Sequence, residues 1–384
     1  MGLSNFQVNG ADLDNLYVKR ELFNKGGLWG FGNGGYGQLG DNSFDNRSSP
    51  VQTVSSGSNW KLAAGGLQHS AAIKTDGTLW TFGQGTYGQM GDNTSVDKSS
   101  PVQTVSAGTN WKTLSCGQYH VCSIKSDGTL WLWGLNSSGE LGDNTITNRS
   151  SPVQTTAGGS NWKQVSCGGR QSAAIKTDGT LWVWGSNGSG QLGDNTTTKK
   201  SSPVQTVAGG TNWKQVSVGS ENMAAIKTDG TLWTWGRGTF GNLGDNTTSA
   251  KSSPVQTVAG GINWKRVSCS GHVAAIKTDG TLWLWGYNAY GELGDNTVTN
   301  KSSPVQTVSA GTNWKLVSVG SYHTAAIKTD GTLWSWGRNN VYSQLGDNTD
   351  TNRSSPVQTV SGGTNWIFVS AGENHTFGIR ENYS

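Results

Sequence analysis

The sequence is poor in charge, in proline and in cysteine, and it has no long apolar run. Charged residues make up 14% of its 384 positions, and the chain has 7 prolines and 4 cysteines. Because no run of about 18 apolar residues occurs, no transmembrane helix is expected. Residues 1–24 are polar and of mixed charge, without the apolar core of a signal peptide, so we expect no secretion signal. What the sequence does have is 57 glycines and 19 tryptophans.

The four cysteines are too few and too irregularly spaced for a disulfide framework or a metal site. Cys116, Cys167 and Cys269 share one position of a repeat that is described next, and Cys122 occupies a position that is mostly alanine elsewhere. Unpaired cysteine often behaves as a small buried hydrophobe. We therefore predict four buried, unpaired cysteines and no metal.

One series of motifs recurs along almost the whole chain, in the order G-T-L-W-x-W-G, L-G-D-N-T, S-S-P-V-Q-T-V, N-W-K-x-V-S-x-G and H-x-A-A-I-K-T-D. Its Leu-Trp pair recurs at intervals of 51 or 50 residues. The pair begins at Leu28, Leu79, Leu130, Leu181, Leu232, Leu282 and Leu333. All prolines fall at one repeat position and all tryptophans at three. Repeats of this length are typical of propellers or solenoids.

The local pattern within each repeat favours a propeller. A-A-I-K, the T-D-G-T turn and L-W-x-W read as a hairpin, in which Asp-Gly would supply the positive φ angles of a tight primed turn. V-Q-T-V and K-x-V-S add two short β-rich runs, and no stretch shows a helical period. Four short strands per repeat make one propeller blade. The predicted fold is thus all-β, a seven-bladed β-propeller of four-stranded blades.

The ends of the repeat region predict how the ring closes. The T-D-G-T turn occurs six times, once as S-D-G-T at 126–129, which is one fewer than the other motifs, and the chain enters the repeats at Gly26–Leu28, midway through a blade. The chain leaves the repeats at His375–Arg380. This segment matches the strand that precedes the Leu-Trp strand in the other repeats and that is missing before Leu28. We therefore predict that the N- and C-terminal strands pair and seal the ring, leaving no open edge. The predicted domains are an N-terminal arm, 1–24, and the propeller, 25–384.

The combination of L-W-x-W-G-x-N-x-x-G-x-L-G-D, S-S-P and G-x-x-H resembles the regulator of chromosome condensation repeat family. A complete copy of its first part runs from Leu282 to Asp295. The resemblance covers residues 25–384 and implies a seven-bladed propeller. Proteins of this kind include a small-GTPase exchange factor that binds chromatin, a plant ultraviolet-B receptor and a bacterial β-lactamase inhibitor, so the resemblance does not by itself imply a function. No blade carries an insertion longer than one residue that could serve as the exchange factor's β-wedge.

The first 23 residues are not repeat and resemble leader segments of structural proteins of tailed phages, especially marine ones. From this resemblance we predict an anchor or assembly segment. Its apolar residues are Phe6, Leu13, Leu16, Tyr17 and Phe23.

Two kinds of polar residue recur at fixed positions of the repeat and could indicate metal-binding sites. One is an aspartate followed by asparagine: Asp41, Asp92, Asp143, Asp194, Asp245, Asp295 and Asp347. One carboxylate per loop falls short of the roughly six oxygens that Ca²⁺ takes, so we predict loop capping. The other is His69, His120, His272, His323 and His375, with Gln171 and Asn222 in the remaining repeats. Because amides replace the imidazole, we predict a structural hydrogen bond between neighbouring strands or blades.

The tryptophans and the cations also recur too evenly to mark a site. Tryptophan at three repeat positions, with Phe31 and Phe82 as the exceptions, is expected to fill the wedge between blades. The net charge is +4, but most cations belong to repeat positions spread round the ring, whereas a nucleic-acid site needs a stripe on one face. We therefore do not expect nucleic acid as a partner.

A specific site is expected where the repeats differ. One variable loop precedes the histidine position, and its candidate partner-binding residues are Gln68, Tyr119, Arg170, Glu221, Tyr322 and Asn374. They should cluster at one mouth of the central channel and suit protein recognition. A second variable loop follows the tryptophan strand and includes 34–36, 86–87, 237–240, 287–290 and 338–342, the last with one extra residue.

These observations favour a non-enzymatic structural or binding module without a cofactor. No acid–base pair or nucleophile stands out. Our main hypothesis is a virion structural protein of a tailed phage, made in the host cytoplasm. It would contact other virion proteins or a host surface, and would be oligomeric in an assembly. The alternative is a cytosolic regulatory protein binder, such as a small-GTPase exchange factor or inhibitor.

Overall fold

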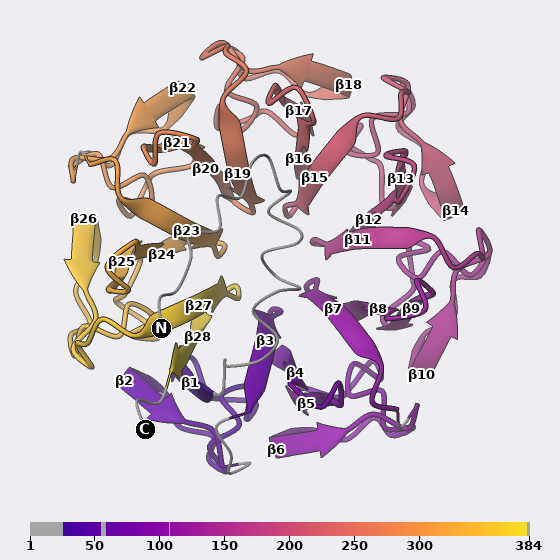
Figure 1. Cartoon of the computed structure of the whole chain (residues 1–384), viewed down its shortest axis with the longest axis horizontal. Coiled ribbons are helices and arrows are strands. Elements are labelled where there is room, and N and C mark those ends of the chain that lie inside the picture. The colour runs from indigo at the N-terminus through magenta and orange to yellow at the C-terminus, as the bar shows by residue number, and fades with distance from the viewer. Residues whose placement is uncertain (1–25, 55–58, 107, 310, 382–384) are drawn as a thin grey trace, which may run out of the picture.

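The structure is a computed structural model that describes residues 26–54, 59–106, 108–309 and 311–381. Its 28 strands form seven blades around a central axis (Figure 1), which confirms the all-β propeller prediction. Within the described residues there is no helix, and so none long and apolar enough to cross a membrane. The predicted anchor residues Phe6, Leu13, Leu16, Tyr17 and Phe23 lie outside the described residues.

Each blade has an inner strand beside the central channel and three more strands outward from it. The inner strands are β3 (Trp60–Gly65), β7 (Trp111–Cys116), β11 (Trp162–Cys167), β15 (Trp213–Val218), β19 (Trp264–Cys269), β23 (Trp314–Val319) and β27 (Trp366–Ala371). The second strands are β4 (His69–Lys74), β8 (His120–Lys125), β12 (Gln171–Lys176), β16 (Asn222–Lys227), β20 (His272–Lys277), β24 (His323–Lys328) and β28 (His375–Glu381).

The third strands carry the L-W-x-W motif, and the outer strands begin at a lysine or arginine just before S-S-P. The third strands are β5 (Leu79–Gly83), β9 (Leu130–Gly134), β13 (Leu181–Gly185), β17 (Leu232–Gly236), β21 (Leu282–Gly286), β25 (Leu333–Gly337) and β1 (Gly26–Gly32). The outer strands are β6 (Lys98–Gln103), β10 (Arg149–Gln154), β14 (Lys200–Gln205), β18 (Lys251–Gln256), β22 (Lys301–Gln306), β26 (Arg353–Gln358) and β2 (Arg47–Gln52).

The first and last strands pair as predicted. β1 lies antiparallel to β28 from Gly26 opposite Glu381 to Gly32 opposite His375, so one blade combines β27, β28, β1 and β2. Gly26 also bridges to Trp60, which joins this blade to the next one in a single eight-stranded sheet. The other five blades are separate four-stranded sheets. The prediction that closure leaves no open edge is wrong. No sheet closes on itself, each keeps its edge strands, and the ring arises because blades pack side by side (Figure 1).

The tight turn between second and third strands differs from the prediction. Of its residues only Gly77, the last of the loop, has a positive φ, of 81°. The turn is therefore neither primed type, because type I′ needs a positive φ at both central residues and type II′ at the first of them. The Gly77 amide donates to the Lys74 carbonyl, and the Lys74 amide donates to the Thr78 carbonyl, which makes a three-residue loop. The physical reason is that the Asp76 carboxylate accepts from both the amide and the hydroxyl of Thr78, which holds Asp76 at a negative φ.

The apolar core lies between blades rather than within one. For example, Ile175 and Leu181 of one blade contact Trp213 and Trp235 of the next. The Trp235 indole donates to the Gln191 carbonyl across the same junction at 2.9 Å. Gly244 lies so close to the Trp285 ring of the next blade that a Cβ there would come within 2.8 Å of it. A glycine is therefore required where the tryptophan fills the wedge.

One of the three tryptophan positions is not core. Trp80 is half-buried, donates its indole N–H to Thr78 and shares the Lys74 ammonium with Trp60. The ammonium lies 4.9 and 4.6 Å from the two ring centroids, a cation–π arrangement. The pattern recurs at Lys125, Lys176, Lys227, Lys277 and Lys328. These tryptophans thus bind a cation of their own repeat as well as filling space.

The prediction that all four cysteines are unpaired is wrong. Cys122 and Cys167 form a disulfide between β8 and β11, which belong to neighbouring blades, and their Cα atoms are 6.7 Å apart. The two thiols meet because position 122 faces position 167 across a blade junction. The spacing of residues within one repeat does not show which positions of neighbouring blades face each other. Cys116 and Cys269 are free, and burial raises the pKa of both thiols.

Candidate protein-binding face

Two kinds of loop share one face of the ring, which we call the loop face. The mouth loops connect inner to second strands at residues 66–68, 117–119, 168–170, 219–221, 270–271, 320–322 and 372–374. The rim loops connect third to outer strands at 33–46, 84–97, 135–148, 186–199, 237–250, 287–300 and 338–352. Strand direction alternates within each blade, so both kinds emerge on the same side. The T-D-G-T turns lie on the opposite side, the turn face.

The mouth loops surround the central channel, as predicted, and hydrogen bonds tie neighbouring ones together. The Gln118 amide donates to the Gly168 carbonyl, and the Gly169 amide donates to the Gly219 carbonyl, each at 3.0 Å. The channel has a volume of about 290 Å³ and is lined mostly by glycine, serine and small apolar residues of the inner strands. Its wall also carries Arg266 and Glu373, but most of it consists of the same small residues in every blade, so it offers a partner little that differs between blades.

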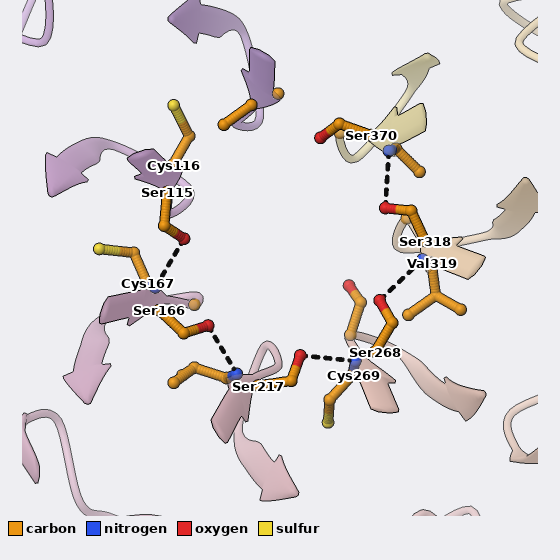
Figure 2. A pocket seen from close by; sticks show the side chains of 18 of the residues that line it. Ser115, Cys116, Ser166, Cys167, Ser217, Ser268, Cys269, Ser318, Val319 and Ser370 are labelled. Carbon is orange, nitrogen blue, oxygen red and sulfur yellow. Dashed lines mark hydrogen bonds between the residues drawn. The ribbon is translucent and has the colours of Figure 1, made fainter. Parts of the chain in front are cut away.

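A ring of serines stiffens the channel wall (Figure 2). The Ser115 hydroxyl accepts from the Cys167 amide of the next blade at 2.9 Å, and Ser217 accepts in the same way from Cys269. Ser166, Ser268 and Ser318 repeat the contact with Val218, Val319 and Ala371. Ala64, which has no hydroxyl, takes this position in one blade. The inner strands thus support the mouth loops as a connected scaffold.

The six predicted binding residues share a backbone role. The carbonyl of each accepts a hydrogen bond at 2.7–2.9 Å from the first amide of the rim loop in its own blade. The pairs are Gln68 with Gln84, Tyr119 with Leu135, Arg170 with Ser186, Glu221 with Arg237, Tyr322 with Arg338 and Asn374 with Asn33. The backbone is therefore fixed while the side chain is free to vary, as the sequence variation indicates.

The aspartate position caps the rim loops, as predicted. In one rim loop the Asp143 carboxylate accepts from the amide and hydroxyl of Thr145 and from Arg149. The same ion pair to a lysine or arginine recurs in all seven blades at 2.6–3.7 Å. These hydrogen bonds lower the pKa of the Asp143 carboxyl against the effect of burial. One whole set of recurring cations is therefore engaged within the fold.

Four of the five histidines join blades beneath the mouth loops, as predicted, and His69 is the exception. His120 Nε2 lies 2.9 Å from the Ser172 hydroxyl of the next blade, and that hydroxyl donates to the Glu140 carbonyl. The serine oxygen must then accept from the imidazole, which places the proton on Nε2. His272, His323 and His375 form the same contact with Thr324, Thr376 and Ser70. Burial lowers the pKa of His120 to about 3.

The hydroxyl partner was not predicted, although the sequence holds a signal for it. Four histidines face serine or threonine in the following blade, whereas His69, Gln171 and Asn222 face Val121, Met223 and Val273. Comparing each histidine with the residue about 52 positions later would have shown this relation.

The Cys122–Cys167 disulfide lies next to His120, so three potential metal ligands lie within 4.8 Å of one another. The disulfide occupies both sulfur atoms, and Ser172 occupies the imidazole Nε2–H. This group therefore acts as a structural link between two blades, and we assign no metal to it.

Aromatic side chains make the loop face asymmetric. Between the blades that contain β17, β21 and β25, Phe240 contacts Tyr287 with ring centroids 5.1 Å apart, and Tyr322 contacts both Tyr287 and Tyr290 at 5.9 Å. We call Phe240, Tyr287, Tyr290, Tyr322 and Arg338 the aromatic–arginine cluster. In each contact an aromatic residue of one blade reaches the loops of the next, a relation between variable loops that sequence analysis did not identify.

A second, smaller aromatic contact lies elsewhere on the same face. The rings of Tyr87 and Tyr119 are 5.2 Å apart. Burial raises the pKa of Tyr119, the Glu373 carboxylate adds to the rise, and Arg170 opposes it. Predicted residues Tyr119 and Arg170 are therefore brought together here, whereas Tyr322 lies in the aromatic–arginine cluster. Glu221 lies beside that cluster, in an ion pair with Arg237 at 2.8 Å.

A buried carboxyl lies beneath the aromatic–arginine cluster. Glu292 is fully buried; one of its oxygens accepts from the Tyr290 amide and the other has no hydrogen-bond partner among the described residues. Burial raises its pKa to about 7, although Arg338 opposes the rise. Five other blades have Gln38, Gln89, Gln191, Asn242 or Gln344 at this position, and the sixth has Glu140, whose pKa is also raised by burial.

We expect Glu292→Gln to stabilise the protein increasingly as pH rises. The folded state keeps this proton up to about pH 7, whereas the unfolded chain loses it above about pH 4.5, so the wild type loses stability between these values. Glutamine keeps the acceptor and cannot ionise. The free energy of unfolding at about pH 8 should rise by up to about 3 kcal/mol, with a smaller gain at about pH 5.5. Denaturant unfolding at both pH values measures this, and an equal gain at both would contradict it.

Comparisons with known proteins agree with this architecture. The RCC1-like domain matches residues 105–384, and the regulator of chromosome condensation (RCC1) repeat matches residues 25–73 and 76–124. The Arabidopsis thaliana ultraviolet-B receptor UVR8 is 32% identical over 219 residues, 56% of this chain and 50% of the receptor. The human E3 ubiquitin-protein ligase HERC2 is 27% identical over 277 residues, 67% of this chain and 6% of the ligase. The chain thus spans half or less of these two relatives.

Solved structures share the fold at low sequence identity. Prp20p from Saccharomyces cerevisiae superposes with a TM-score of 0.85 at 17% identity, covering 99% of this chain and 97% of that one. Human WBSCR16 superposes with a TM-score of 0.81 at 21% identity, covering 94% and 100%. Prp20p is described as binding Gsp1p and histones. With seven matching repeats and a family match over more than half of its length, the chain belongs to the regulator of chromosome condensation (RCC1) repeat family.

Proposed function

We propose that the chain is a non-enzymatic regulatory module that binds a protein partner through its loop face. The observation that carries the proposal is the asymmetry of this face. Elsewhere the blades repeat the same ion pairs, cation–π contacts and serine hydrogen bonds, whereas aromatic and arginine side chains gather on the loop face at one set of neighbouring blades. Aromatic residues and arginine are enriched at protein–protein interfaces and at their energetic hot spots.

The relatives support a regulatory protein binder better than a virion protein. Prp20p is described with protein partners, and UVR8 and HERC2 are a receptor and a ligase. The virion hypothesis, including its location and its anchor segment, has no support in the comparisons and stays a prediction from the sequence. The small-GTPase partner expected from the sequence stays a prediction. Exchange activity is not part of the proposal, because no rim or mouth loop is more than one residue longer than its equivalents.

Site-specific photo-crosslinking tests which face binds. We expect a benzophenone amino acid at Tyr119 or Tyr322 to form covalent adducts with a protein partner in the cells that naturally make this chain. The same group at Thr177 or Thr228, exposed residues of the turn face, should form none. Adducts are read by gel shift and mass spectrometry. Adducts formed only from the turn face, or from neither face, would contradict the proposal.

A further inference from the structure

The aromatic–arginine cluster is a preformed surface. Tyr287, Tyr290 and Tyr322 contact one another at centroid distances of 5.9–6.3 Å, with interplanar angles between 58° and 90°. Each ring is therefore held by its neighbours, and all three are half-buried rather than covered. Side chains that are already ordered lose little entropy on binding, which favours affinity.

The charge beside these rings is positive. The Arg338 guanidinium lies over Tyr290 and Tyr322, at 5.1 and 5.3 Å from their centroids. Among the described residues no carboxylate forms an ion pair with Arg338, and its Nε makes only a long hydrogen bond, 3.4 Å, to Asn340. Arg237, over Phe240 at 5.5 Å, is paired with Glu221, and the two side chains are 44% and 45% exposed. Arg338 is thus the cation left for an incoming anion.

The same rim loop presents an apolar side chain. It contains the extra residue that sets it apart from the other rim loops, and Val341 within it is 46% exposed. Ser343 in this loop has a φ of 56°, and it is the one described non-glycine residue outside the asparagine position with a positive φ. The insertion therefore changes the shape of the face where the rings and the free guanidinium lie.

From this arrangement we propose that the cluster binds an acidic, extended segment of a protein partner. A carboxylate would accept from Arg338, and a bulky apolar side chain beside it would rest on the tyrosine rings and Val341. This rests on the proposed function, since it names the chemistry of the partner for the same face. Carboxylates bind guanidinium with directed, charge-assisted hydrogen bonds, and aromatic rings supply the apolar contact.

Single-stranded nucleic acid also combines stacking with positive charge, but it fits this surface less well. Strand binding needs a groove of several cations along the backbone and open ring faces for the bases. Here one of the two arginines is neutralised by Glu221, each of these tyrosine contacts places the edge of one ring against the face of another, and Arg338 lies over Tyr290 and Tyr322. An acidic peptide needs only one free guanidinium and the ring edges.

Selection from a phage-displayed library of random dodecapeptides on the immobilised full chain tests the proposal. We expect the selected pool to be enriched in aspartate and glutamate beside a bulky apolar residue. The most enriched peptide should bind at least about 10-fold more tightly than its copy with asparagine and glutamine instead. Fluorescence anisotropy measures both peptides, and the preference should weaken as salt rises from about 50 mM to about 300 mM.

Matched variants locate the contact. Arg338→Gln should abolish the preference for the acidic peptide, whereas Arg170→Gln, at the other aromatic contact of the same face, should keep it. Any of four results would overturn the inference. These are a selected pool without carboxylate enrichment, a selection that yields no peptide, an unchanged preference for the acidic peptide in Arg338→Gln, and tighter binding of a labelled oligouridine than of the peptide. If crosslinking from Tyr322 still captures a partner in that case, the proposed function stands and only the partner chemistry is wrong.

Discussion

Lowering the pH from 7 to about 5 is expected to unfold the propeller. The five histidines are buried and neutral, with pKa values lowered by burial to about 4 for His69 and about 3 for the other four. In the unfolded chain they bind protons below about pH 6.5. Folding therefore excludes protons that the unfolded chain takes up, and stability falls as pH falls through this window.

The expected size of this effect is large because the sites add up. At about pH 5 each histidine contributes about 2 kcal/mol of lost stability, so five contribute on the order of 10 kcal/mol. The proton that Glu292 regains over the same pH range offsets about 2 kcal/mol of this loss, and the remainder is still comparable with the whole stability of a typical domain. The local reason is visible at His120, whose Nε2 proton is used and whose Nδ1 has no hydrogen-bond partner among the described residues. A proton on Nδ1 would be a buried charge without an acceptor.

Circular dichroism during a pH titration measures the transition. The matched control replaces His120, His272 and His323 by glutamine, the residue that stands at Gln171, where the amide donates to the Gly219 and Ser220 carbonyls. This variant should unfold at a pH lower by about one unit or more. Unfolding of both proteins only below about pH 4 would instead assign acid sensitivity to carboxylates such as Asp143 and Asp194, whose pKa values hydrogen bonds lower against the effect of burial.

Deleting β28 is expected to abolish cooperative folding. The strand pairs with β1 along seven residues and with β27 on its other side. Phe377 and Ile379 are fully buried in a core with Leu28 and Trp60. Losing two such side chains alone costs about 5–10 kcal/mol, and the deletion also exposes the edges of β1 and β27. Because typical domains have only about 5–15 kcal/mol of stability, the truncated chain should be recovered unfolded or aggregated.

A circular permutant separates strand pairing from chain order. It joins Glu381 to Leu28 through Asp-Gly-Thr, the turn that this blade lacks, and opens the chain between Gly209 and Gly210, where an added Cβ on Gly209 would meet nothing within 4 Å. Compared with a control chain of residues 26–381, it should give the same circular dichroism spectrum and unfold cooperatively. A β28-deleted chain that unfolds as cooperatively as this control would show that the β1–β28 pairing is dispensable.

Much of this protein follows from its sequence because packing and hydrogen bonding repeat in every blade. The strict spacing of Trp133, Trp184 and Trp235 predicts blades, since a large ring at the same place in each repeat can be buried only against the next repeat. The missing T-D-G-T turn predicts the β1–β28 pairing. The variable loops predict which face differs from blade to blade.

Contacts between neighbouring blades could be seen only in the folded structure. Cys122 meets Cys167, and His120 meets Ser172, across junctions where residues about one repeat apart in sequence come into contact. The aromatic–arginine cluster likewise needs loops of three blades, and the pKa of Glu292 depends on what covers it. The length of the repeat, the four strands of each blade and the pairing of β1 with β28 could be predicted from the sequence, because they follow from local strand pattern and spacing. Disulfide pairing, proton positions and the shape of the binding face depend on the contact between blades, which only the folded ring defines.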